Sequence, residues 1–340
     1  MGKISMIGLD LAKSVFQVHG VDGSGAAVLK QKLRRERVLG FFAGLEPCVV
    51  VMEACGSGHY WAREIAKCGH ETKLIPASYV KPFVKRQKND AADAEAICEA
   101  ASRPIMRFVA GKSEAQQASA VVFRARDLLV RQRTQIINAL RGHLAEFGFV
   151  VPKGPAHVTR LLAIVEEDAA LPESIRAPLQ GMVAALRVLE AEIAKLDKEI
   201  AARAKSDADA RRLMTIPGVG PITATALLSI APPAAAFENG RHFAAWLGLA
   251  PRQHSSGGKD KLGRITKAGD KTLRRLLIIG ASAVLRHAAI KPPPAGSWLA
   301  RMMAGKPRML VAVALANKMA RIIWALLRNG TSYQASSAAA

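Results

Sequence analysis

The sequence predicts an α/β domain followed by a mainly α-helical remainder. Apolar runs of strand length fill about the first 75 residues and alternate with helical patterns. From about residue 113 onward, apolar residues at helical spacing dominate, including a heptad pattern between 179 and 200. A length of 340 residues allows about two to three domains. We expect an α/β domain, a helical region, a second helical domain and a disordered tail, with the respective boundaries 1–108, 113–206, 207–330 and 331–340.

The α/β domain begins with three predicted strands and then alternates between helices and strands. The pair Asp22-Gly23 is a hairpin signal between the second and third strands. The apolar run over 48–52 is typical of a strand buried on both faces. Strands are predicted at 4–10, 15–19, 26–32, 48–53 and 72–75, and helices at 35–45, 60–68 and 91–101. This order is that of an RNase H-like fold, an argument by analogy.

Four acidic residues are placed where this fold would bring them together. Asp10 ends the first strand and Glu53 ends the strand after the first helix, and these two strands are neighbours in the expected topology. Asp90 and Asp93 lie three apart, which on a helix places them on one face with Cβ atoms about 5–6 Å apart. Four converging carboxylates predict a site for Mg²⁺, with Mn²⁺ as the alternative, that cuts or joins phosphodiesters. The alternative for the pair is that Asp90 caps the helix and Asp93 complements its dipole.

The composition indicates a polyanionic partner. The chain has 49 Lys and Arg against 27 Asp and Glu, a net charge of +22 and a pI near 10.3. These values favour nucleic acid, with a surface facing anionic lipid as the alternative. Seventeen of the cations lie between 241 and 328, where Asp260 and Asp270 are the only acids. Because no apolar run of about 18 residues and no signal-peptide pattern is present, we expect a cytoplasmic protein with no membrane partner.

The middle of the chain predicts two long helices separated by a break. The segment 116–147 has apolar residues recurring every seven, and Pro152-Lys-Gly-Pro155 interrupts it. The heptad pattern then predicts a coiled coil. The pattern leaves open whether these apolar heptad positions pack against a helix of the same chain or form a dimer interface. Its apolar positions are Leu179, Met182, Leu186, Leu189, Ile193, Leu196 and Ile200.

Two motifs dominate the C-terminal part. Gly218 and Gly220 precede Pro221 at a predicted helix start, which resembles a helix-hairpin-helix element and presents backbone N–H groups to a phosphate. The alternative there is a plain helical turn. Further on, Ser255 and Ser256 head a loop rich in Gly, Lys and Arg. A serine in such a loop can attack phosphorus while the cations stabilise the developing charge, although a hydrogen-bonding turn residue is the alternative.

We expect nucleic-acid contacts from basic residues beside the acids and the serine, and from the two glycines. These residues are Lys85, Arg86, Lys88, Gly218, Gly220, Arg252, Lys259, Lys261, Arg264, Lys267, Lys271, Arg274 and Arg275.

Taken together, the motifs resemble the transposases of the insertion-sequence one-ten family, in its eleven-eleven branch. These DEDD transposases are also called bridge-RNA-guided recombinases. The resemblance extends from about residue 6 to 329 and rests on motifs in both halves of the chain. They are Gly-Leu-Asp10-Leu-Ala-Lys, Met-Glu53-Ala-Cys-Gly-Ser-Gly-His, Lys-Asn-Asp90-Ala-Ala-Asp93-Ala-Glu, Ile-Pro-Gly-Val-Gly, and Leu-Gly-Leu-Ala-Pro-Arg-Gln-His-Ser-Ser256-Gly-Gly-Lys.

The resemblance implies a RuvC-like N-terminal domain whose four acids bind Mg²⁺, and a coiled-coil region used in assembly. It also implies a C-terminal transposase domain in which Ser256 is the nucleophile. Because two serines are adjacent, Ser255 is the alternative nucleophile. The family uses a non-coding bridge RNA that pairs with donor and target DNA. Members act as homo-oligomers, here a dimer or tetramer, with acids and serine contributed by different subunits.

The leading hypothesis is a transposase or recombinase of a mobile element that cleaves and rejoins DNA in the bacterial cytoplasm, at the nucleoid. The alternative is a Holliday-junction-type resolvase that uses the four acids and water only. A third hypothesis is an architectural nucleic-acid binder without catalytic activity.

Overall fold

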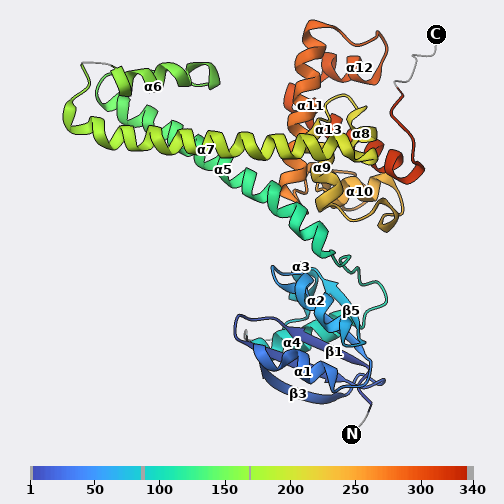
Figure 1. Cartoon of the computed structure of the whole chain (residues 1–340). Helices are drawn as coiled ribbons and strands as arrows, with labels where there is room; N and C mark the ends of the chain where they lie inside the picture. The colour runs from blue at the N-terminus through green and yellow to red at the C-terminus, as the bar shows by residue number, and fades with distance from the viewer. Residues whose placement is uncertain (1–2, 86–88, 168–169, 335–340) are drawn as a thin grey trace. The chain divides into compact units, whose positions relative to one another are not determined.

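The computed structural model describes residues 3–85, 89–167 and 170–334. The chain folds as two compact units, Met1–Gln117 and Ala118–Ala340 (Figure 1). Two residues expected to contact nucleic acid, Arg86 and Lys88, lie outside the described residues, as do residues 335–340 of the expected tail. The finer division of the second unit into a helical region and a C-terminal domain stays a prediction.

The first unit contains a mixed five-stranded sheet in the order β3-β2-β1-β4-β5. Strands β1, β2 and β3 are antiparallel, whereas β4 and β5 run parallel to β1. This is the predicted arrangement, and it fits a RuvC-like fold. The strands are β1 Met6–Asp10, β2 Val15–Val21, β3 Ala27–Arg34, β4 Val49–Glu53 and β5 Glu71–Ile75.

Helices cover both faces of this sheet, which explains why strand β4 is apolar on both sides. Val50 and Met52 of β4 belong to a core shared with α1 (Val38–Ala43) and α2 (Gly58–Lys67). Val51, between them, belongs to a separate core. That second core includes residues of α4 (Asp90–Ala101) and Val80 of the short helix α3 (Ala77–Val80). The helix predicted over 35–45 is shorter, because its first turn, Arg35–Arg37, is a 3₁₀-helix.

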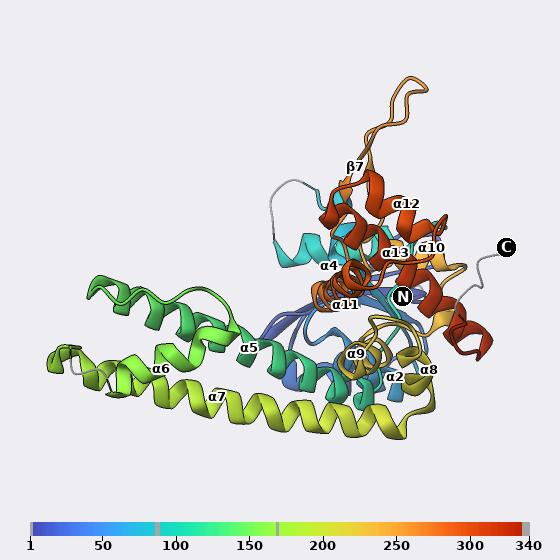
Figure 2. The same cartoon turned by 90° about the horizontal axis from the view of Figure 1, so that it is seen from above.

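The second unit begins with long helices that pack along one another. Helix α5 (Glu114–Glu146) and α7 (Glu173–Ser206) lie beside the shorter α6 (Val158–Glu167) (Figure 2). Arg126 and Asp197 form an ion pair between the two long helices. Leucines and valines of the three helices and of the connections between them form one core: Leu140, Leu144, Val151, Leu161, Val165, Leu171, Leu179, Val183 and Leu186.

The heptad positions of α7 are only partly covered by this packing. Leu179, Leu186, Ile193 and Ile200 are buried, while Met182, Leu189 and Leu196 are half-buried. Their use in a coiled coil with a second chain stays a prediction.

The rest of the second unit is a helical bundle around one large core. Helix α13 crosses this core, and it is long and apolar enough to span a membrane. Its Ala316, Met319 and Ile323 are instead buried against the neighbouring helices. The helices are α8 Ala208–Met214, α9 Pro221–Ile230, α10 Gly240–Trp246, α11 Lys271–Ile290, α12 Trp298–Gly305 and α13 Arg308–Asn329.

The segment expected as a loop rich in Gly, Lys and Arg is a β-hairpin instead. Strands β6 (Pro251–Gln253) and β7 (Leu262–Ile265) pair antiparallel. The hairpin is exposed over most of its length, and Figure 2 shows it projecting away from the helices of the same unit.

Candidate active site

Three of the four predicted acids meet at one edge of the sheet. Asp10 ends β1, whereas Asp90 and Asp93 lie in the first turn of α4. One carboxylate oxygen from each lies within 4.8 Å of the other two. Carboxylate oxygens at this separation are a suitable ligand set for a hard divalent cation.

Glu53 lies beside this group but not within it. It ends β4, and the pairing of Leu9 with Met52 makes β1 and β4 parallel neighbours, as predicted. The Glu53 charge is near enough to Asp10 to contribute to its raised pKa. The sequence therefore predicted the neighbourhood of all four acids, and the structure brings three of them into direct proximity.

The approach of α4 to β1 depends on Gly8. A Cβ atom at this position would overlap the carbonyl oxygen of Ala94 and lie 3.0 Å from the backbone nitrogen of Cys98. Only glycine lets the helix backbone lie this close to the strand. Because Asp10 follows two residues later, this contact brings the two parts of the acid cluster together. The sequence signal for such a contact is a glycine within an apolar strand.

The start of α4 is capped by Asn89 and not by Asp90. The Asn89 side chain accepts a hydrogen bond from the Ala92 backbone N–H at 2.8 Å. The alternative reading of Asp90 as the helix cap is therefore wrong, because the neighbouring amide already fills that position. Asp90 and Asp93 still complement the positive end of the helix dipole.

The electrostatics of the cluster favour a bound cation. Burial, followed by the charges of Asp93, Asp90 and Glu53, raises the pKa of Asp10 to about 6. A hydrogen bond from the Leu11 backbone N–H acts in the opposite direction. Carboxylates that repel one another in this way are stabilised in their charged forms by a divalent cation.

The two serines occupy the tip of the β6–β7 hairpin. Gly257 and Gly258 both have positive φ angles, 57° and 74°. Ser256 and Lys259 flank them, and the Lys259 N–H donates to the Ser256 carbonyl at 3.1 Å. Two central residues with positive φ are typical of the tight type I′ turn.

The hydrogen bonds distinguish the two serine side chains. The Ser255 hydroxyl oxygen accepts a hydrogen bond from the Lys261 backbone N–H at 3.1 Å, so it stabilises the hairpin. Across residues 3–85, 89–167 and 170–334, no group hydrogen-bonds to the Ser256 hydroxyl, and Ser256 is exposed. Both serines are exposed, so the hydrogen bond distinguishes them: Ser255 is a hydrogen-bonding turn residue, whereas the Ser256 hydroxyl has no partner among the described residues.

Arg274 does not occupy the exposed position expected of a phosphate contact. Only 8% of its surface is accessible, and its guanidinium donates to the Leu247 carbonyl at 3.0 Å and the Ala268 carbonyl at 2.6 Å. These carbonyls precede β6 and follow β7. Arg274 therefore ties together the two ends of the hairpin. A Cβ atom on Gly248 would lie 2.8 Å from this guanidinium, which leaves room only for glycine.

The other residues expected to contact nucleic acid have varied surroundings. Lys85 pairs with Glu95 at 2.6 Å, and Arg275 pairs with Asp127. Gly218, with φ 86°, packs its backbone against the Gly280 carbonyl of α11, whereas Gly220 is exposed at the N-cap of α9. The remaining cations are exposed on or next to the hairpin: Arg252, Lys259, Lys261, Arg264, Lys267 and Lys271.

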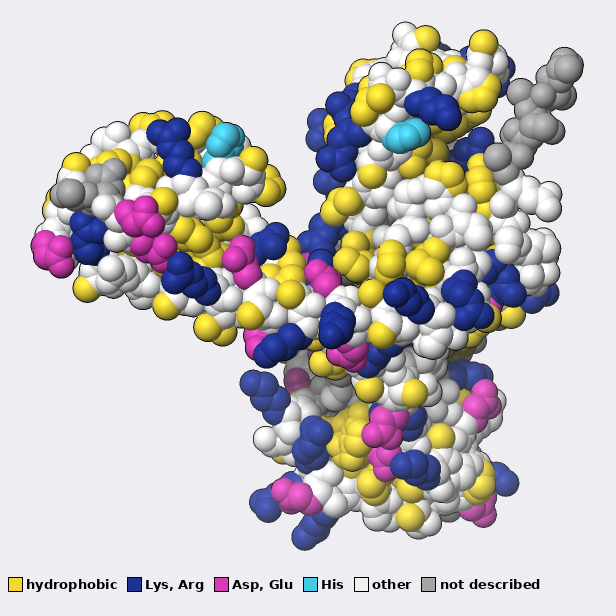
Figure 3. Space-filling model, turned by 45° about the horizontal axis from the view of Figure 1, so that its top comes forward, with side chains coloured by type: hydrophobic (Ala, Val, Ile, Leu, Met, Phe, Trp, Pro, Cys, Tyr) yellow, Lys and Arg dark blue, Asp and Glu magenta, His cyan; other side chains and the backbone are white. Residues whose placement is uncertain are grey.

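Lys and Arg outnumber acidic side chains on the C-terminal bundle. On the face drawn in Figure 3, this bundle carries many cations and few Asp or Glu side chains. Such a surface attracts the phosphate backbone of nucleic acid.

Two family models match the chain. One, described as a transposase of the DEDD type, matches residues 7–149, and the other, described as "Transposase IS116/IS110/IS902 family", matches residues 210–293. A "Probable family 20 transposase" of Pseudomonas aeruginosa is 51% identical over 334 residues, covering 97% of this chain and 99% of the relative. The transposases for IS1328 of Yersinia enterocolitica and IS1111A of Coxiella burnetii are each 39% identical over 98% of this chain, and over 99% and 92% of their own lengths.

The chain belongs to the IS110/IS1111 transposase family. It is thus the transposase of an insertion sequence, a DNA-processing enzyme whose substrates are DNA. The acids lie within the match to the first family model, and Ser256 lies within the match to the second.

Proposed function

We propose that this transposase excises and inserts its element by metal-assisted DNA cleavage and rejoining, with Ser256 as the nucleophile. The observation that carries the proposal is the meeting of Asp10, Asp90 and Asp93 within 4.8 Å. A second support is the accessible Ser256 hydroxyl at the tip of a hairpin surrounded by exposed cations.

The acids would hold Mg²⁺, with Mn²⁺ as the alternative, through Asp10, Asp90 and Asp93, with Glu53 beside them. A bound divalent ion would polarise the scissile phosphate and neutralise charge that develops on it. The protein contributes the preset positions of the carboxylates, which Gly8 and the Asn89 cap maintain. Because the ligands come from a strand end and a helix end, little rearrangement is needed when the ion binds.

The serine step conserves the energy of the cleaved bond. The Ser256 oxygen forms a bond to phosphorus while the bond from phosphorus to a sugar oxygen breaks. The serine proton passes by way of solvent to the released sugar oxygen, which becomes a hydroxyl. In rejoining, a sugar hydroxyl attacks the phosphoserine and Ser256 regains its proton. Exposed Arg252, Lys259 and Arg264 would stabilise the charge that develops on the phosphate.

We further propose that sequence choice is delegated to a non-coding bridge RNA that pairs with donor and target DNA. The support is the net charge of +22, most of it between 241 and 328, because Lys and Arg contacts to the nucleic-acid backbone carry no sequence information. The enzyme would act as a dimer or tetramer in the bacterial cytoplasm, at the nucleoid. RNA that co-purifies with the protein should include one species from the flank of the element; only random cellular RNA would exclude guidance.

The nucleophile is tested by comparing Ser256→Ala with Ser255→Ala on radiolabelled element-end DNA. Ser256→Ala should abolish the covalent protein–DNA adduct seen after denaturing electrophoresis. Ser255→Ala should retain the adduct at a reduced rate, because it removes a hydrogen bond in the hairpin and not the attacking group. An adduct in Ser256→Ala that is lost in Ser255→Ala would move the role to Ser255. Adducts in both variants would exclude a serine nucleophile at this motif.

A junction-resolving endonuclease is the second candidate function. The observation that favours it is that the acid cluster forms entirely within the first compact unit, without the serine. Water would then attack the phosphate directly. Such an enzyme leaves free DNA ends and no adduct, and its cleavage survives Ser256→Ala but not Asp93→Asn.

A further inference from the structure

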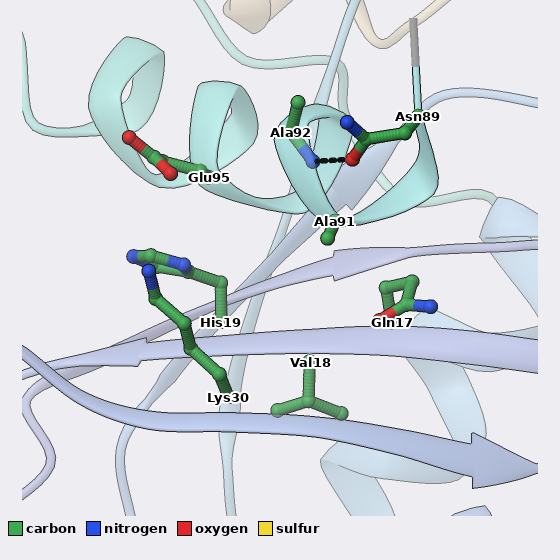
Figure 4. Close-up of a pocket in the computed structure, with 8 residues that line it drawn as sticks. All are labelled: Gln17, Val18, His19, Lys30, Asn89, Ala91, Ala92 and Glu95. Carbon is green, nitrogen blue, oxygen red and sulfur yellow. Dashed lines mark hydrogen bonds between the residues drawn. The ribbon is translucent and has the colours of Figure 1, made fainter.

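A cavity of about 200 Å³ lies between strand β2 and helix α4 in the first unit (Figure 4). Liquid water occupies about 30 Å³ per molecule, so the cavity has room for several waters or for one flat ring system. The space exists because α4 presents alanines to it. It is lined by Gln17, Val18, His19, Lys30, Asn89, Ala91, Ala92 and Glu95.

Two buried polar side chains face this cavity without a protein partner. Gln17 is 8% and His19 is 6% exposed, and both project from β2 toward α4 in Figure 4. Within the described part of the chain, neither side chain hydrogen-bonds to another protein group. Among the described residues, their amide and imidazole atoms are not counted with the fully buried side-chain atoms that lack a partner, so these atoms are open to solvent in the cavity. Their partners must therefore enter the cavity as water or as ligand.

The cavity lies directly beside the acid cluster. Gln17 is the β2 residue paired in register with Asp10, so both side chains emerge on the same face of the sheet. Asn89 lines the cavity and immediately precedes Asp90. A group in this cavity would thus lie next to a phosphate held at the acids.

The two ends of the cavity carry different side chains: amides at one end, and charged groups around an imidazole at the other. Gln17 and the Asn89 NH₂ group offer amide atoms near the acids. At the other end, the Lys30 ammonium group and the Lys85–Glu95 ion pair surround His19. Burial, followed by the charges of Lys30 and Lys85 against that of Glu95, lowers the pKa of His19. The imidazole is therefore neutral near pH 7, with one donor and one acceptor.

We propose that this cavity is a subsite for one unpaired base of the DNA strand next to the cleaved phosphate. Amides and a neutral imidazole match the donors and acceptors on the edge of a nucleobase, and Lys30 suits the adjoining backbone phosphate. Enzymes that do chemistry on a base show that a pocket of this kind can hold an unstacked nucleotide. The inference rests on the proposed function, because it requires that the acids act on DNA.

The test uses 2-aminopurine, a base whose fluorescence rises when it leaves the stack. The label is placed in turn at each of the three positions on either side of the cleaved phosphate in synthetic element-end DNA. The full-length Ser256→Ala protein, with its co-purified RNA and Ca²⁺, binds this DNA without cleaving it. We expect a several-fold rise at one position, next to the cleaved phosphate. No rise at any position would overturn the proposal.

Cavity variants connect that signal to the site. In the Ser256→Ala background, Gln17→Leu and His19→Phe should remove most of the rise while DNA affinity changes less than about threefold. Ala91→Leu fills the same space from α4 without altering the sheet and should have the same effect. The matched control is Gln31→Ala, since Gln31 pairs with Val18 and lies on the opposite face of the sheet. A rise that persists in all three cavity variants, or that appears only with labelled RNA, would contradict the DNA subsite.

Cleavage by the wild-type protein separates this inference from the function on which it rests. The same labelled DNA is incubated with wild-type protein and Mg²⁺. Cleavage without a fluorescence rise in the Ser256→Ala protein leaves the proposed function intact and excludes the subsite. A rise without wild-type cleavage excludes the function and retains a base-binding cavity.

Discussion

The clustering of Asp10, Asp90 and Asp93 depends on a residue without a side chain. At Gly8, the backbone of α4 lies against β1, and a Cβ atom has no space between them. Catalytic carboxylates from different elements meet only if those elements pack at a defined distance. The geometry of the site is therefore determined by packing beneath it as well as by the acids themselves.

Gly8→Ala should move α4 outward and separate the acids. We expect a loss of about 1–3 kcal/mol in the free energy of unfolding, as for other overpacked sites, and a larger than tenfold loss in the rate of adduct formation. Urea unfolding and single-turnover kinetics measure the two effects. Gly40→Ala is the matched control, because a Cβ atom there contacts nothing within 4 Å and alanine favours the helix. If Gly8→Ala forms the adduct at the wild-type rate, the position of α4 does not limit the rate of adduct formation.

The raised pKa of Asp10 gives a prediction for the metal-free protein. The folded protein holds this proton up to about pH 6, whereas an unfolded Asp releases it near pH 3.9. The folded state therefore binds more protons between these values, and its stability falls as the pH rises through that window. At pH 7.5 in EDTA, Asp10→Asn should raise the free energy of unfolding by on the order of 1 kcal/mol, a value reduced for solvent screening of this half-buried group.

Mg²⁺ should make the wild-type protein more stable than Asp10→Asn at pH 7.5. Since the ion binds the deprotonated carboxylate, its stabilisation of the wild-type protein should increase from pH 5 to pH 7.5, and Asp10→Asn should gain much less. Urea unfolding with EDTA or Mg²⁺ at both pH values provides the comparison. Asp260→Asn, at an exposed hairpin position, should behave as wild type. A metal-free wild-type protein more stable at pH 7.5 than Asp10→Asn would contradict the assigned pKa shift.

The β6–β7 hairpin is positioned by its base. Arg274 donates to the carbonyls of Leu247 and Ala268, and the Lys267 N–H donates to the Gly248 carbonyl at 3.1 Å. The Asn317 side chain adds a hydrogen bond to the Leu249 carbonyl at 3.2 Å. These bonds attach an exposed element to the buried core, so Ser256 extends from a rigid support.

Arg274→Lys should impair the use of Ser256 more than the binding of DNA. Both bonds come from Nη1 of Arg274, which lies one bond farther along the side chain than the Nζ of a lysine, so lysine should lose at least one of them. A lost buried bond of about 1.4 kcal/mol corresponds to about a tenfold effect. We expect a tenfold slower adduct formation with DNA affinity and its salt dependence nearly unchanged. Lys271→Met, at an exposed position on the same helix, should instead weaken binding and reduce the salt slope by about one. If Arg274→Lys instead reduced the salt dependence of DNA binding, Arg274 would be a phosphate contact after all.

The sequence predicts some elements of this protein well for a physical reason. A strand buried on both faces is a continuous apolar run, and the parallel strands β1 and β4 end at the same edge, so Asp10 and Glu53 were expected to be neighbours. Asn89 was also readable as a helix cap, but the adjacent Asp90 is an equally good cap by residue type.

Other features depend on contacts that the sequence pattern does not contain. The hairpin was missed because its strands are exposed and polar, so the Gly257-Gly258 turn signal lacks flanking apolar alternation. Arg274 lies in a basic run and resembles its neighbours, and its burial depends on carbonyls 27 and 6 residues away. The cavity at Gln17 and His19 likewise arises only when α4 packs on β2.

Across the whole chain, the acids and the serine belong to different compact units, Met1–Gln117 and Ala118–Ala340. The long helices α5 and α7 belong mainly to the second unit, and α7 keeps several apolar heptad positions half-exposed. The proposed function uses both groups, and they act either within one chain or from two different chains. If one chain supplies both groups, a mixture of an acid variant and a serine variant stays inactive. If two chains supply them, the same mixture regains part of its activity.

Mixing Asp10→Asn with Ser256→Ala should restore activity if different subunits supply the acids and the serine. In a symmetric dimer with exchanged sites, each mixed dimer has one site with intact acids from one subunit and an intact serine from the other. An equimolar, re-equilibrated mixture should therefore form adduct at about a quarter of the wild-type sites in a single turnover. Asp10→Asn mixed with Asp93→Asn is the control and should stay inactive, because every subunit then carries a damaged acid set. An inactive first mixture, with mixed dimers confirmed by differently tagged subunits, would show that each chain completes its own site.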